Sequence, residues 1–137
     1  MRRTLYSHCL TQPALASAVR TNGTVNGITV DLGVYGNDFR SALFIVSAGT
    51  VTDGSHAITM QDSPDGTNWT AVPASKRQGS LPTIVAANDD ALFEFGYIVG
   101  TNQFVRLVAT TSGATTGGAF SAVAVLSGAS NSPVARA

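Results

Sequence analysis

Short runs of strand-forming residues, separated by clusters of turn residues, constrain the fold of this chain more than any other feature. The runs cover residues 25–32, 41–48, 56–63, 69–72, 83–86, 92–99, 104–111 and 119–128. In the third run Ile58 and Met60 alternate with Thr59 and Gln61, which is the period of a half-buried strand. The segments between the runs are rich in Gly, Asn and Asp, which accept tight-turn conformations. Because helical periodicity is almost absent, the pattern predicts an all-β fold, an antiparallel jelly-roll-like β-sandwich of about eight short strands.

The two ends of the chain differ from this body. Residues 1–24 and 129–137 are polar and rich in small residues, so they have little to bury. We therefore expect an extended N-terminal arm over 1–24, one sandwich domain over 25–128 and a C-terminal tail over 129–137. The two ends are either disordered, as termini often are, or ordered only when they lie on a neighbouring subunit. A single short helix is expected between Pro13 and Val19.

The charge balance excludes some classes of partner. The formal net charge is zero and 12% of the residues are charged, against about 25% in ordinary soluble domains. Without clustered Lys and Arg we expect no direct nucleic-acid binding, and without an apolar run of about 20 residues we expect no membrane span. Cys9 is the only cysteine, so no intrachain disulfide is possible, and assembly in the cytoplasm is favoured over secretion. A neutral surface is poorly protected against association, which suggests that partners cover it.

The stretch DSPDGTNWTAV, residues 62–72, invites three interpretations: a calcium loop, a sugar-binding edge or a hairpin turn. A calcium loop of the EF-hand type fails, because the aspartate spacing is wrong and Pro73 stands where its twelfth-position glutamate belongs. Asp53 adds at most one more oxygen ligand. The turn interpretation is favoured: Pro64 to Gly66 joins two strands, and Trp69 folds back as an apolar anchor. Carbohydrate binding by Trp69 stays open if its ring is exposed.

No arrangement of residues predicts catalysis, a cofactor or a metal. The histidines are His8, in the arm, and His56, at the head of a strand, where it is interpreted as a solvated or hydrogen-bonded residue rather than a general base. One cysteine and two distant histidines do not supply the ligands of a zinc site. Asp89 and Asp90 are adjacent and are interpreted as loop residues. We expect no catalytic, cofactor-binding or metal-binding residues, and no enzyme activity.

Two of the runs are apolar on both faces. They are ALFIVSA, residues 42–48, and AFSAVAVL, residues 119–126. In a two-layer sandwich the outer face of each sheet ordinarily meets water and carries polar residues. Such a strand is covered either by the chain's own loops or by another subunit, and the sequence does not decide between them.

The runs 92–99 and 104–111 are predicted to form a hairpin. Its odd positions would share the inner face, and these are Phe93, Phe95, Tyr97, Val105, Leu107 and Ala109. The same register would bring Glu94 and Arg106 together on the outer face.

The succession of strands and turns over residues 28–128, with DSPDGTNW at 62–69 and FEFGY at 93–97, resembles the capsid cement (decoration) proteins of tailed bacteriophages. The resemblance implies a structural virion protein with a jelly-roll subunit that binds the outside of the head. It further implies assembly in the host cytoplasm, the major capsid protein as partner and a homodimer. It brings no catalytic residues.

Two other classes remain as alternatives. The first is a tail-associated or carbohydrate-binding β-sandwich module of a phage particle, which would need Trp69 and Tyr35 as an exposed aromatic platform. The second is a small hydrolase, which would need His56 within hydrogen-bonding reach of a serine and an acid.

Overall fold

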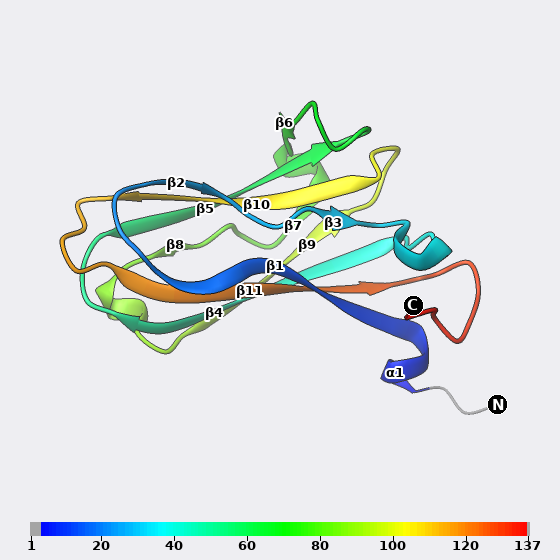
Figure 1. Cartoon of the computed structure of the whole chain (residues 1–137), viewed down its shortest axis with the longest axis horizontal. Helices are drawn as coiled ribbons and strands as arrows, with labels where there is room; N and C mark the ends of the chain where they lie inside the picture. The colour runs from blue at the N-terminus through cyan, green and yellow to red at the C-terminus, as the bar shows by residue number, and fades with distance from the viewer. Residues whose placement is uncertain (1–3, 137) are drawn as a thin grey trace.

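The chain folds into two antiparallel β-sheets packed face to face (Figure 1). The computed structural model describes residues 4–136. One sheet runs in the order β1 (Cys9–Arg20), β11 (Gly118–Ser127), β4 (Ser41–Val51), β9 (Leu92–Ile98) and β7 (Arg77–Gln78). The other runs in the order β2 (Gly23–Asn26), β10 (Phe104–Ser112), β5 (Ser55–Ser63) and β6 (Thr70–Ala71), with β3 (Val30–Asp31) beside β10 and β8 (Thr83–Ile84) beside β5. The prediction of an all-β, jelly-roll-like sandwich is confirmed.

Helical structure in the described residues is limited to single turns. They are α1 (Leu5–His8) and the 3-10 turns η1 (Val34–Gly36), η2 (Ala74–Lys76) and η3 (Ala86–Asn88). None of the helices within residues 4–136 is long and apolar enough to cross a membrane.

The core lies between the sheets and is filled by alternate residues of the long strands. On β11 these are Phe120, Ala122, Ala124 and Leu126, which are buried, while their neighbours face outward. Phe44 on β4 and Phe95 on β9 stack at 5.9 Å between ring centroids. This period of two is what the sequence pattern predicts for strands that bury one face.

The N-terminal segment departs from expectation. Residues 9–20 form strand β1 and pair with β11, so the predictions of an extended arm and of a short helix from Pro13 to Val19 are wrong here. The strand contributes buried Leu10, Ala14 and Leu15 to the core. Its register shifts between Pro13 and Leu15 and again between Leu15 and Ala18. These irregularities break the period of two, which is why the sequence conceals the strand.

The C-terminal segment is also packed rather than free. Val134 is buried, and its N–H donates to the carbonyl of Ser7 at 2.9 Å. Asn37 and Ala135 exchange two hydrogen bonds, each of 2.8 Å, between the Asn37 side chain and the Ala135 backbone. The expectation of a tail with little to bury is therefore wrong at Val134, and the two ends of the described chain lie together beside α1 (Figure 1).

The predicted 92–111 hairpin is wrong. Both runs are strands, but β9 pairs with β4 and β7, whereas β10 pairs with β5, β2 and β3 in the other sheet. Glu94 and Arg106 consequently lie on the outer faces of different sheets. The inner-face assignment holds: Phe95, Tyr97 and the odd β10 positions are buried and Phe93 is partly buried against them. Periodicity identifies the buried face of a strand, but it does not identify the neighbouring strand.

Candidate interaction surface

The middle of the outer face of the five-stranded sheet carries a block of apolar side chains, with the serine pairs Ser47–Ser121 and Ser41–Ser127 on either side of it along the strands. Val123 and Val125 on β11 pair with Ile45 and Leu43 on β4, and all four side chains point away from the core. Val123 is 42% exposed, and the other three side chains are half-buried. Further apolar residues flank this block on the neighbouring strands, namely Pro13 on β1 and Leu92 and Ile98 on β9. These seven residues are called the outer patch below.

Charge is almost absent from this face. At the outward positions of β1, β11, β4 and β9, strands that all lie within the described chain, Glu94 is the one charged residue. It sits on β9, opposite Ile45 and to one side of the block.

The outer face of the other sheet is more polar. Its positions carry Thr110 on β10, paired with Thr24 on β2, and Thr59 and Gln61 on β5, together with Val108, which lies opposite Thr59 and is 6% exposed. Arg106 lies beside Gln61 and donates from Nε to its side-chain oxygen at 2.9 Å. A polar outer face is what a solvent-facing antiparallel sheet carries. The outer patch is therefore part of the more apolar of the two outer faces of this domain.

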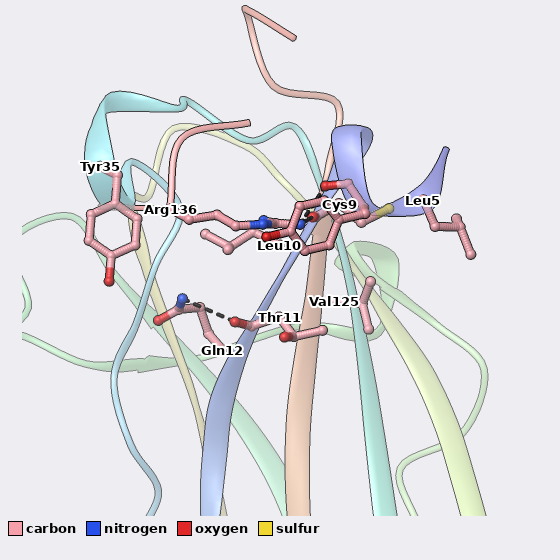
Figure 2. Close-up of a pocket in the computed structure, with 9 residues that line it drawn as sticks. Leu5, Cys9, Leu10, Thr11, Gln12, Tyr35, Val125 and Arg136 are labelled. Carbon is pink, nitrogen blue, oxygen red and sulfur yellow. Dashed lines mark hydrogen bonds between the residues drawn. The ribbon is translucent and has the colours of Figure 1, made fainter. Parts of the chain in front are cut away.

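A cavity of about 690 Å³ adjoins one end of the outer patch. Figure 2 shows Leu5 of α1, Tyr35 and Val125 around it, so the cavity and the patch share Val125. The guanidinium of Arg136 lies over the ring of Tyr6, 3.8 Å from its centroid, and donates to the backbone oxygens of Tyr6 and Cys9. Arg136 thereby fastens the C-terminal segment to the start of β1, while Leu5 stays 81% exposed beside the opening.

The 62–68 segment is the hairpin turn that the sequence predicts. It joins β5 to β6, which pair through Gln61 with Ala71 and Asp62 with Thr70. The Asp65 carboxylate accepts hydrogen bonds from the backbone N–H and side-chain amide of Asn68 and from the N–H of Thr67. These bonds, those of Asn68 and Thr67 first, hold the pKa of Asp65 well below its usual range.

Trp69 is half-buried beside this turn. The guanidinium of Arg106 covers its ring at 4.2 Å from the centroid. One face of the indole is therefore occupied. Tyr35, the second aromatic residue that a carbohydrate-binding platform would need, is exposed.

Asp62 has a role that the sequence did not reveal. It is buried on β5, and its Oδ2 accepts a 2.8 Å hydrogen bond from the hydroxyl of buried Tyr97 on β9. Burial, together with this hydrogen bond and the carboxylate charge, raises the pKa of Tyr97 well above its usual range. The pair links the two sheets through the core. The only signal in the sequence is an aspartate at a position where strand alternation predicts an inward side chain.

His56 is fully buried, at 0% exposure, and is not placed for catalysis. Its Nδ1 lies 2.8 Å from the hydroxyl of Thr111, and its Nε2 lies 3.1 Å from the backbone oxygen of Asp53. The Asp53 carboxylate is engaged elsewhere: it accepts N–H groups from residues 115–117, and these bonds, that of Gly117 first, lower its pKa. His56 thus has a hydroxyl beside it but neither an acid partner nor access for a substrate.

The other candidate side chains have structural surroundings. Asp89 and Asp90 follow η3 in a loop, as predicted, and Asp89 accepts the N–H of Val51. His8 in α1 hydrogen-bonds the carbonyl of Thr4, and Cys9 is a free thiol at the start of β1. Within residues 4–136 no three His, Cys, Asp or Glu side chains gather as metal ligands would.

Comparison with known proteins adds little to this geometry. No protein-family model matches the chain, and no curated protein matches it. A solved structure, the crystal structure of PirA, is similar with a TM-score of 0.40 and 14% identity, covering 93% of this chain and 97% of that chain. A likeness at this level carries no argument about function.

Proposed function

We propose that this chain is a structural protein of a tailed-phage particle, a capsid cement or decoration protein that binds the outside of the head. Its partner is the major capsid protein, and it stabilises contacts between neighbouring capsid subunits. It acts as a homodimer and assembles in the host cytoplasm. The resemblance over residues 28–128 supports this function, and the outer patch is the observation that carries its assembly role, because an exposed apolar block favours association with another protein surface.

The outer patch supports an assembly role because an exposed apolar face costs solubility unless a partner covers it. Stable protein contacts usually bury more than about 1,000 Å² in total. Many copies attached to one rigid shell act together, since each attachment raises the effective concentration of the next contact. A neutral domain of this kind adds buried area at the seams of a shell without attracting the nucleic acid inside.

A non-enzymatic role is supported by the surroundings of His56. Its hydroxyl neighbour, Thr111, is buried with it, and Asp53 offers the ring a backbone carbonyl in place of a carboxylate. Nucleophilic catalysis needs an accessible nucleophile and an oriented base. The side chains here stabilise the end of the sandwich.

Cosedimentation with assembled heads tests the proposal. Heads prepared without the protein are mixed with the purified chain, pelleted and then imaged, and heads with and without it are heated. We expect the protein in the pellet, density on the outer surface of the head, and a higher temperature for release of packaged DNA. Density on the tail, or binding only to a glycan array, would replace this function with the tail-associated or carbohydrate-binding alternative.

A further inference from the structure

We propose that the outer patch is the surface through which two copies of this chain pair, sheet against sheet. This inference rests on the homodimer in the proposed function and assigns it a surface. It predicts that the five-stranded sheets lie inside the dimer and the polar six-stranded sheets lie outside it.

The distribution of charge favours a second copy as the occupant. Two identical surfaces pack well only if like charges do not face each other across the interface. This face carries one carboxylate, that of Glu94, which lies away from the centre. A two-fold axis along the strands, between β11 and β4, places Val123 opposite Ile45 of the other copy and Val125 opposite Leu43. The same axis sets Glu94 against the β1 side of the other copy, near Pro13, rather than against a second Glu94. The apolar block therefore meets an apolar block, as in the aligned packing of sandwich sheets.

The available area is sufficient for a stable dimer. Four adjacent strands lie about 4.8 Å apart; three of them extend about 34 Å, as the ten-residue β11 does, and the seven-residue β9 extends about 24 Å, giving a footprint of about 600 Å² per subunit. Two subunits would then bury about 1,200 Å², which reaches the lower end of the roughly 1,200–2,000 Å² typical of stable interfaces.

The cavity beside α1 extends the same surface. It shares Val125 with the outer patch, and the exposed side chains of Leu5 and Tyr6 stand at its edge. An approaching copy can therefore bury these two side chains together with the patch, which adds apolar area where the sheet itself ends.

Sedimentation equilibrium of three proteins tests the inference. We expect the wild-type chain to have the mass of two copies in the micromolar range, and Val123→Glu to raise the dissociation constant by about 100-fold or more, because it buries an unpaired charge. Thr110→Glu is the matched control: it places the same charge at an exposed strand position on the outer face of the other sheet, and it should leave the dimer intact. A wild-type chain that stays monomeric, a mass above two copies, or a Val123→Glu variant that still dimerises would overturn the inference.

A second variant guards against misfolding. If the thermal melt shows that Val123→Glu no longer folds, Leu92→Glu takes its place, because Leu92 is 63% exposed and its substitution does not disturb the core. Failure of this inference and failure of the proposed function are distinguishable. A chain that dimerises through the patch but does not pellet with heads refutes the capsid role alone, and a monomer that pellets with heads refutes the homodimer and its surface but leaves the capsid role standing.

Discussion

Replacing Tyr97 with Phe should destabilise the domain by far more than the loss of one surface hydroxyl. Tyr97 is 3% exposed and Asp62 is 4% exposed, so the variant would leave a buried carboxylate oxygen without its 2.8 Å donor. Hydrogen bonds to charged groups contribute about 1.5–3 kcal/mol, and the unpaired partner costs its desolvation. For a chain of 137 residues this corresponds to a fall in Tm of roughly 5–15 °C.

Equilibrium urea denaturation, followed by circular dichroism, measures this loss. Tyr35→Phe is the control, because Tyr35 is exposed and should change the free energy of unfolding by less than about 0.5 kcal/mol. Adding Asp62→Asn to form a double-mutant cycle isolates the coupling between the two side chains, expected at about 1–2 kcal/mol. If Tyr97→Phe is as mild as Tyr35→Phe, the link between the sheets contributes nothing and our account of the core is refuted.

The pH dependence gives an independent signature of the same pair. Because burial and Asp62 raise the pKa of Tyr97 in the folded state, the unfolded chain releases the phenol proton first. This stabilisation is complete below the unfolded pKa of about 10 and is lost as the pH rises through the folded value. The stability of wild type should therefore fall above about pH 10 while that of Tyr97→Phe falls less, so the gap between them narrows. A constant gap over that range would contradict the role of the hydroxyl.

Three further predictions concern turns. Backbone hydrogen bonds, that of Gly117 first, lower the pKa of Asp53, so its stabilisation is present above the unfolded pKa and lost as the pH falls through the folded value. Asp53→Asn should lower the urea midpoint at neutral pH, and its deficit should shrink below about pH 4. Gly117→Ala should destabilise strongly, since its Cβ would clash with the carbonyl of Arg20, whereas Gly113→Ala, also at positive φ but in open space, should cost only about 1 kcal/mol in the same denaturation assay. Millimolar calcium should leave the Tm unchanged, because the acceptors of the 62–68 turn are already engaged; a rise reversed by chelator would show that the turn binds metal.

The sequence predicts the faces of the strands well and their neighbours poorly. Alternation on the 56–63 run and at Phe95 and Tyr97 follows directly from burial on one side of a sheet, and these residues are in the core. Pairing depends on where the connection leads, and the segment after β9 crosses to the other sheet instead of turning back. No local pattern distinguishes these two courses, since residues 99–103 contain turn chemistry that suits either.

The ends of the chain were mispredicted for a related physical reason. Strand β1 is rich in small and polar residues, and its pairing with β11 has two irregularities. Its buried residues Leu10, Ala14 and Leu15 therefore do not follow the period of two by which a strand is recognised in a sequence. The tail likewise shows one apolar residue, Val134, whose burial depends on contacts with Ser7 and Asn37 far away in the sequence. Contacts between residues so far apart in the sequence cannot be predicted from the local pattern of residues.

The outer patch is a feature that needs both the sequence and the structure to be interpreted. The runs at 42–48 and 119–126 are apolar on both faces, and from the sequence alone either loops or a second subunit could have covered the outer side. Within the described residues Val123 is 42% exposed and Leu92 is 63% exposed. The loops of the described chain therefore do not cover these two side chains. The opposite sheet carries a mostly polar outer face, as expected where a sheet meets water, so the apolar block on this sheet requires a different explanation. Burial against a second copy, as we propose, would supply this explanation, because the near absence of charge lets two identical surfaces face each other.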